Sequence, residues 1–270
     1  KAFIEDKVGN YDIAYSCFEK SQNDPGYKKY NKESFLNYID LYKHNIKNKE
    51  IFITMNNNIE KYNIAFLIGF PRSGTTLLDT ILRSHPDIDV LEEKPLISNV
   101  ETLVKNKLNI RLDNLLSISE DNIKMLRNEY LKFISKYTNN EKKLIIDKMP
   151  LNTINLPLIK LLFPKAKIIF TYRNPYDTVL SCFQQTFEPN QAMNNFVDLK
   201  STSKMYDKVM DAWDIYKRNL SLDYITSKYE ELIDDFDSNT LKILDFLGVG
   251  WNDNVMNYRE TALNRGKINT

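Results

Sequence analysis

The stretch FLIGFPRSGTTLLDTILRSHP, residues 66–86, constrains the fold of this chain more than any other feature. An apolar run, Ile64–Ile68, leads into Gly69, and four residues separate Gly69 from Gly74. A buried strand that turns through such a loop into a helix gathers backbone N–H groups at the positive end of the helix dipole, and this arrangement binds anions. The pattern predicts a strand, a phosphate-binding loop and a helix over Thr75–Ser84.

The loop lacks one residue that most nucleotide-binding loops have. In the pattern G-x-x-x-x-G-K-[ST], a lysine reaches the β- and γ-phosphates of a triphosphate, but Thr75 stands at that position here. A kinase or ATPase, which manages a triphosphate together with magnesium, is therefore disfavoured. Arg72 can supply a permanent cation instead. The candidate phosphate-binding residues are Arg72, Ser73, Gly74, Thr75 and Thr76.

From residue 64 onward, apolar strands alternate with amphipathic helices, and this is the pattern of an α/β fold with a parallel sheet flanked by helices. Three more strands are expected, at Lys143–Ile146, Ala166–Arg173 and Asp223–Thr226. Helices are expected after them, and the segment 96–140 is predicted to be mostly helical. The fold class predicted is a P-loop-type α/β domain over residues 59–270.

Residues 1–58 carry helical periodicity without a strand signal, so a short all-helical segment is expected before the α/β domain. Within it, small and aromatic residues of the stretch 11–21 recur at intervals of three and four. One interpretation is a simple amphipathic helix. The other is the end of a tetratricopeptide array, whose packing positions follow these intervals. Such a repeat would offer a surface to a protein partner.

Composition excludes several classes of partner and location. The formal net charge is +1, so no overall field favours nucleic acid, and no apolar run approaches the roughly 18 residues of a membrane span. No signal peptide is visible, but the chain opens at Lys1 and not at a methionine, so we interpret it as a trimmed sequence in which this absence says nothing about targeting. Cys17 and Cys182 are expected to be buried free thiols in a reducing compartment, which predicts a cytoplasmic location.

A second pair of residues is placed to bind another phosphate. Arg173 leaves the third expected strand at its carboxyl end, where ligands bind in open α/β sheets. Ser181 lies about two helical turns further on and can face the same side. A guanidinium with a nearby hydroxyl suits a phosphate. The alternative is that Arg173 forms a surface ion pair with Asp177.

These motifs together carry a resemblance to a known family. PRSGTTLL resembles the 5′-phosphosulfate loop of sulfotransferases, which use 3′-phosphoadenosine-5′-phosphosulfate (PAPS), and FTYRNPYDTVLS resembles their second signature. KYEEL is similar to a Tyr-Glu pair of the tyrosylprotein sulfotransferases. Over residues 64–270 the chain resembles that branch, including the bacterial proteins that fuse it to tetratricopeptide repeats.

The resemblance implies a metal-free transfer of a sulfuryl group from PAPS to a hydroxyl acceptor, with adenosine 3′,5′-bisphosphate as the product. The acceptor would be a peptide tyrosine, a carbohydrate or a small molecule. Arg173 and Ser181 would bind the 3′-phosphate, and Tyr229 would stack on the adenine, unless Tyr229 is only a core aromatic residue.

The resemblance also implies the catalytic residues. By register from the loop, Glu93 in VLEEKP matches the general base of the tyrosylprotein branch, and Pro95 stands where that branch has a substrate-contacting arginine. Lys148 matches a lysine beside the leaving oxygen, and Arg72 would assist it. The adjacent carboxylates of Glu92 and Glu93 are expected to raise the pKa of one of them.

The two histidines are expected to take no part in the reaction, because His44 lies in the helical segment and His85 lies at the far end of the loop helix. Two alternatives remain open: a small-molecule P-loop kinase and a non-catalytic repeat-containing interaction protein. Variable loops set the acceptor, and residues 186–205 are the expected acceptor wall or lid. Arg265 is expected to begin a mobile loop whose continuation beyond Thr270 completes the nucleotide site.

Overall fold

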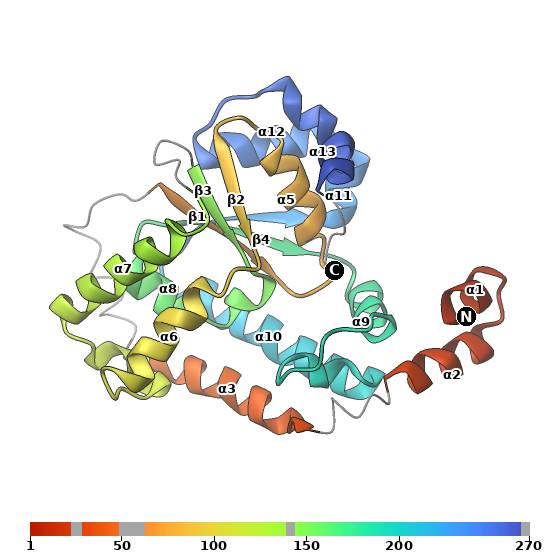
Figure 1. The fold of residues 1–270 in the computed structure, drawn as a ribbon, viewed down its shortest axis with the longest axis horizontal. Helices are drawn as coiled ribbons and strands as arrows, with labels where there is room; N and C mark the ends of the chain where they lie inside the picture. Colours follow the sequence, from red (N-terminus) through yellow and green to blue (C-terminus); the bar gives the residue numbers. More distant parts are fainter. Residues whose placement is uncertain (23–28, 49–62, 139–143, 266–270) are drawn as a thin grey trace.

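The structure is a computed structural model that describes residues 1–22, 29–48, 63–138 and 144–265. Its centre is a sheet of five parallel strands in the order β2-β3-β1-β4-β5 (Figure 1). The strands are β1 (Ile64–Gly69), β2 (Ile88–Glu92), β3 (Leu144–Lys148), β4 (Lys167–Tyr172) and β5 (Asp223–Lys228). The predicted α/β class with a parallel sheet is confirmed.

One strand was not predicted. β2 is the edge strand beside β3, and it carries the sequence IDVLE, in which Ile88 and Val90 are buried. The period-two alternation of a strand holds for Ile88–Val90 but fails at Leu91, which is also buried, and the strand has only five residues, two of them acids. β3 also extends further than predicted, because Asp147 and Lys148 belong to the strand.

Helices cover both faces of the sheet, because successive side chains of a strand point to opposite faces. Ala65 and Leu67 of β1 pack with α5 (Thr75–Arg83) and α12 (Phe236–Leu247). Phe66 and Ile68 belong to the larger core on the other face. That core is covered by α6 (Leu96–Asn106), α7 (Glu120–Ile134), α8 (Leu156–Leu162) and α10 (Leu199–Asn219). Figure 1 shows α5 and α12 on one side of the sheet and α8 and α10 on the other.

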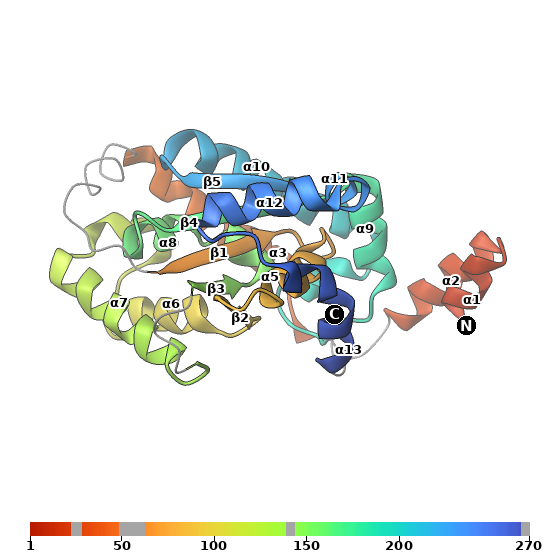
Figure 2. The ribbon, with the colours of Figure 1, turned by 90° about the horizontal axis from the view of Figure 1, so that it is seen from above.

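The N-terminal helices differ in how they join this body. α1 (Ala2–Lys7) and α2 (Tyr11–Ser21) project from it (Figures 1 and 2). They are held where Phe18 meets Phe183 of α9 (Pro175–Gln184), with ring centroids 6.2 Å apart. In contrast, α3 (Lys32–His44) places Leu36, Ile39 and Tyr42 in the main core. α3 is therefore part of the α/β body in its packing, and a tetratricopeptide origin for α1 and α2 stays a prediction.

Two smaller expectations can be compared with the structure. Cys17 and Cys182 are both free thiols, but only Cys182 is buried, so the expectation of two buried thiols was wrong for Cys17. No helix in the described ranges has both the length and the apolar character needed to cross a bilayer.

The packing of α3 predicts the effect of truncating its core side chain. We expect Ile39→Ala to lower the free energy of unfolding by about 2–5 kcal/mol, because the side chain is fully buried and leaves a cavity. Urea unfolding should remain a single transition. The same change at Ile13, which is 49% exposed on α2, is the matched control and should cost less than about 0.5 kcal/mol. An equal, small loss at both positions would mean that α3 does not contribute to the core.

Candidate active site

The parallel sheet brings the predicted site residues to one edge. Arg72, Glu93, Arg173 and Tyr229 follow the carboxyl ends of β1, β2, β4 and β5, and Lys148 is the last residue of β3. All five strands run in one direction, so their carboxyl ends share one edge of the sheet. β1 lies between β3 and β4, and ligands of open α/β sheets bind at such a reversal of strand order.

Two glycines allow the phosphate loop its close contacts. A Cβ on Gly69 would lie 2.5 Å from the carbonyl oxygen of Thr171, so no side chain fits between β1 and β4 there. Gly74 has a φ of 98°, which only glycine adopts readily. A Cβ on Gly74 would also lie 2.7 Å from the ring of Tyr229. The loop and the Tyr229 ring are therefore in direct contact.

The loop is held from beneath by side chains of neighbouring elements. The hydroxyls of Ser73 and Thr171 are hydrogen-bonded at 2.9 Å, and the Cys182 thiol donates to the Pro71 carbonyl at 3.3 Å. Burial raises the pKa of the Cys182 thiol, so it stays protonated as a donor. The side chain of Ser73 therefore faces the fold and shapes the loop, and Thr75 is buried as well.

Arg72 connects the two phosphate-binding motifs predicted from the sequence. Its Nε donates to Ser181 Oγ at 3.0 Å, although the two residues are 109 positions apart. Its backbone has a φ of 67°, which is uncommon for a residue with a side chain and is found where the surrounding structure imposes it, often at functional sites.

Arg173 lies against Tyr229, the residue predicted to stack on the adenine. Its guanidinium carbon is 4.8 Å from the centre of the Tyr229 ring, and one Nη donates to Asp177 at 3.3 Å. The ion pair considered as an alternative is therefore present, but it occupies only one nitrogen. Arg173 Nε is buried and has no hydrogen-bond partner in the part of the chain that the structure describes, so the group keeps a donor available.

Lys148 forms the centre of a charged cluster at the other end of this edge. Its side chain is fully buried, and its ammonium donates to Glu92 at 3.1 Å and to Glu93 at 2.8 Å. The backbone N–H of Glu93 donates to the Lys148 carbonyl at 2.7 Å. Glu93 has a φ of 49°, so the chain leaves β2 through a strained position that turns its carboxylate toward Lys148.

Arg265 completes this cluster from the C-terminal side. Its guanidinium forms ion pairs with Glu92 and with the buried Asp79 of α5, the latter at 3.0 Å, and donates to Thr80. The Arg265 side chain therefore has three partners, whereas few contacts were expected for it, and the mobile loop that it was expected to begin stays a prediction. Gly266, the next residue of that expectation, lies outside the described residues.

The cluster distinguishes the two adjacent glutamates. Burial would raise the pKa of Glu92, but Lys148 and Arg265 together hold it below its usual value. Glu92 is therefore not a carboxylate whose pKa is raised, because the two cations outweigh the effect of burial. The Glu93 side chain is 42% exposed against 26% for Glu92, and Lys148 is its ion-pair partner. Glu93 is thus the carboxylate more accessible to a substrate.

Two further titratable groups have structural roles, one beneath the site and one at the far end of α5. Asp147 is buried beneath the site and accepts a hydrogen bond from the Tyr130 hydroxyl at 2.8 Å. Burial raises the pKa of Asp147 to about 7 despite that bond. His85 accepts from the Asp87 N–H through Nδ1, so its Nε2 donates to the Gly250 carbonyl at 2.9 Å. With both ring nitrogens bonded, the structural interpretation of His85 is confirmed.

Comparison with known proteins decides the family. The pattern described as "Sulfotransferase family" matches residues 65–253, more than half of the chain. The chain belongs to the sulfotransferase family. It is 31% identical to an uncharacterized protein of Aquifex aeolicus over 73% of this chain and 27% of that protein. It is 29% identical to the protein-tyrosine sulfotransferase of Drosophila melanogaster, over 76% of this chain and 42% of that protein. The chain thus spans less than half the length of either relative.

Solved sulfotransferase structures share the fold. The sulfotransferase domain from the curacin biosynthetic pathway covers 74% of this chain, and 78% of that domain is matched, with a TM-score of 0.51 and 17% identity. The sulfotransferase STF1 from Mycobacterium tuberculosis H37Rv has a TM-score of 0.50 at 16% identity, with 84% of this chain and 79% of that chain covered. The kinase and interaction-protein alternatives find no support in these comparisons.

Sequence reasoning overlooked the part that Arg265 and Asp79 play in this site. Arg265 is far along the chain from its partners, 186 positions from Asp79 and 173 from Glu92. The one signal in the sequence was Asp79 itself, because an acid on the apolar face of the loop helix, where Leu78 and Leu82 are buried, needs a cation nearby. The sequence does not say which cation.

The cluster predicts that Arg265 contributes to stability through two carboxylates. We expect Arg265→Met to lower the free energy of unfolding at pH 7 by about 1.5–3 kcal/mol, the range for hydrogen bonds to charged groups. Urea denaturation measures this loss. Arg83→Met is the matched control, because Arg83 pairs with Asp79 at 2.9 Å but has no contact with Glu92. It should cost less.

A double variant checks the cause of that loss. Asp79→Asn removes the buried charge that Arg265→Met would leave without this partner, so Asp79→Asn should recover part of the stability in the Arg265→Met background. Strictly additive losses would show that Arg265 and Asp79 do not interact energetically.

Proposed function

We propose that this chain transfers a sulfuryl group from PAPS to a hydroxyl acceptor. One observation supports the proposal most directly. A glycine-bordered anion loop, the Arg173–Tyr229 pair and the Glu93–Lys148 pair lie together at one edge of the sheet. Family membership supports the class of reaction. The printed name of the Drosophila relative gives tyrosine as that protein's acceptor, and the acceptor of this chain is a separate question.

The residues of the edge fit the nucleotide. The loop amides before α5, with Arg72 and the partly exposed Thr76, would hold the 5′-phosphosulfate. Arg173, whose Nε is buried without a partner, would hold the 3′-phosphate together with Ser181. The Tyr229 ring would stack on the adenine. Arg72 already donates to Ser181, so the two phosphate sites adjoin each other.

When bound, PAPS supplies an activated sulfuryl group. Glu93 takes the proton of the acceptor hydroxyl, which makes that oxygen a better nucleophile. Lys148 and Arg72 place positive charge beside the loop, where negative charge gathers as the sulfuryl group is transferred. We propose that these cations act without a metal ion, in which case chelation by EDTA leaves turnover unchanged.

The first test concerns nucleotide binding. Arg173→Ala should weaken binding of adenosine 3′,5′-bisphosphate by about 1.5–3 kcal/mol, because it removes a charge-assisted hydrogen bond. Binding of adenosine 5′-phosphosulfate, which lacks the 3′-phosphate, should change little. Isothermal titration calorimetry measures both affinities.

Asp177→Ala is the matched control for this variant, because it breaks the same ion pair and keeps the guanidinium. It should leave bisphosphate affinity unchanged or higher. Equal weakening of both ligands by Arg173→Ala would contradict a 3′-phosphate role for Arg173.

The second test concerns the general base. Glu93→Gln should keep nucleotide affinity and reduce kcat by about 10²–10⁴-fold, the usual contribution of a general base. Glu92→Gln is the adjacent control and should reduce kcat less, because Glu92 is engaged by Arg265 as well as Lys148. Single-turnover kinetics with saturating PAPS give the comparison. Turnover at the wild-type rate in Glu93→Gln would exclude Glu93 as the base.

A further inference from the structure

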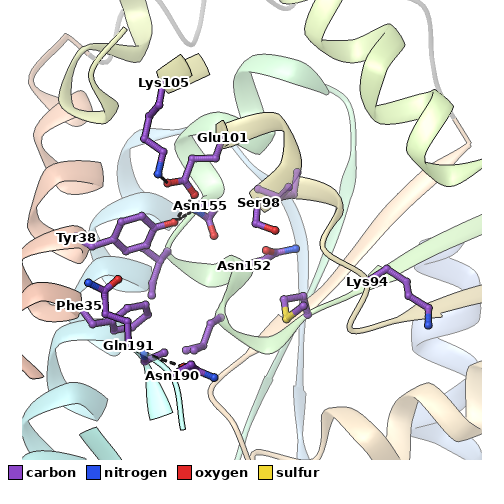
Figure 3. Close-up of a pocket in the computed structure, with 15 residues that line it drawn as sticks. Phe35, Tyr38, Lys94, Ser98, Glu101, Lys105, Asn152, Asn155, Asn190 and Gln191 are labelled. Carbon is purple, nitrogen blue, oxygen red and sulfur yellow. Dashed lines mark hydrogen bonds and ion pairs between the residues drawn. The ribbon is translucent and has the colours of Figure 1, made fainter. Parts of the chain in front are cut away.

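A cavity of about 380 Å³ adjoins the proposed reaction centre. Its walls come from α3, α6, the segment 149–155 and residues 190–192. Phe35 and Tyr38 of α3 line one side, and Ile97 and Ser98 of α6 line another (Figure 3). This volume lies within the range of about 300–1,000 Å³ that is common for small-molecule sites.

The cavity lies next to the chain segments that carry the proposed catalytic residues. Lys94 and Met149 line it, and they directly follow Glu93 and Lys148 in the chain. A molecule in the cavity therefore lies beside the two chain segments that carry the proposed base and the buried cation. Residues 190–192 belong to the segment expected to form an acceptor wall, although α10 begins at Leu199, so only the part before that residue is loop.

One polar side chain in the cavity lacks a partner. Asn152 is only 6% exposed, and it points into the cavity, which Ser98 also lines (Figure 3). Its side-chain amide makes no hydrogen bond to any residue that the structure describes. Neither polar atom of this amide is among the fully buried side-chain atoms that lack a partner, so both are open to a molecule in the cavity. A hydroxylated ligand in the cavity would satisfy both its donor and its acceptor.

Of the three charged side chains that line the cavity, Glu101 and Lys105 are paired with each other. The Glu101 carboxylate accepts from the Tyr38 hydroxyl at 2.7 Å and from Lys105 at 2.8 Å. Asn155 donates to the Tyr38 hydroxyl at 2.7 Å, which closes this network. The Lys94 ammonium lies 5.2 Å from the centre of the Tyr137 ring, and in Figure 3 its side chain extends away from the other labelled residues.

Apart from Lys94, whose side chain extends away from the other labelled residues, the surface that remains for a ligand is therefore neutral, with amides, hydroxyls and an aromatic ring. Amides can donate and accept at once, as the hydroxyl groups of a sugar require, and the Phe35 ring offers an apolar face. An acidic peptide would instead need unpaired cations, because a carboxylate that is buried without one is costly. The Lys105 ammonium is already engaged by Glu101.

We propose that this cavity binds a neutral glycosyl acceptor, and that Asn152 selects it; this inference rests on the proposed sulfotransferase function. In the reaction, a sugar hydroxyl oxygen forms the new S–O bond and its proton passes to Glu93. The S–O bond to the 5′-phosphate of PAPS breaks, and its electron pair remains on adenosine 3′,5′-bisphosphate. The products are a sugar sulfate ester and the bisphosphate.

The binding experiment uses saturation-transfer NMR on the whole chain, with and without adenosine 3′,5′-bisphosphate. The probes are methyl glycosides of glucose, galactose, fucose and N-acetylglucosamine, and a tyrosine peptide flanked by acidic residues. We expect at least one glycoside to bind and the peptide not to bind. Asn152→Ala should weaken binding of that glycoside at least tenfold. Asn106→Ala, an exposed position of α6 outside the cavity, is the matched control and should have no effect.

A kinetic experiment with PAPS separates the acceptor site from the nucleotide site. Asn152→Ala should raise the KM for the glycoside at least tenfold and leave the KM for PAPS unchanged. Binding of the peptide alone, binding of none of the four glycosides, or glycoside binding that Asn152→Ala does not weaken would each overturn the inference. Failure of adenosine 3′,5′-bisphosphate to bind would count against the proposed function instead. The NMR measurements made without the bisphosphate would still decide which ligands the cavity binds.

Discussion

The close approach of β1 and β4 is the constraint on which the site depends. Gly69 ends β1 where any side chain would collide with the Thr171 carbonyl of β4. With β3 paired on its other side, β1 is buried along its whole length. The parallel pairing then places the carboxyl ends of all five strands at one edge. The phosphate loop and residues from the four other strand ends can meet there although long segments of the chain separate them.

Electrostatic balance is the second requirement at this edge. Three cations (Lys148, Arg83 and Arg265) are connected by ion pairs to three carboxylates (Asp79, Glu92 and Glu93). Buried ion pairs stabilise a fold only when their geometry is complete, because each charge loses its hydration. The arrangement pairs the buried Lys148 ammonium with two carboxylates, and it engages Glu92 more fully than Glu93. Glu93 is then the carboxylate of the pair that a substrate can reach.

The proposed acceptor cavity takes one of its walls from outside the range that the family pattern matches. The family pattern matches residues 65–253, while Phe35 and Tyr38 of α3 lie before that range and Arg265 lies after it. The parts common to the family build the phosphate loop and the residues of the proposed transfer. A helix outside the matched range supplies one wall of the cavity. Membership of the family therefore does not determine the chemistry of the acceptor in this chain.

The sequence by itself determined the fold class, the phosphate loop and four of the five strands, because apolar runs and glycine spacing are local signals. The strand β2 was missed, since its alternation is short and includes acids. Only the tertiary structure decided that Arg72 reaches Ser181, that Arg265 binds Asp79 and Glu92, and that the amide of Asn152 is left without a partner. Each of these depends on which segments the sheet brings together, and a contact between positions more than a hundred residues apart leaves no periodicity in the sequence.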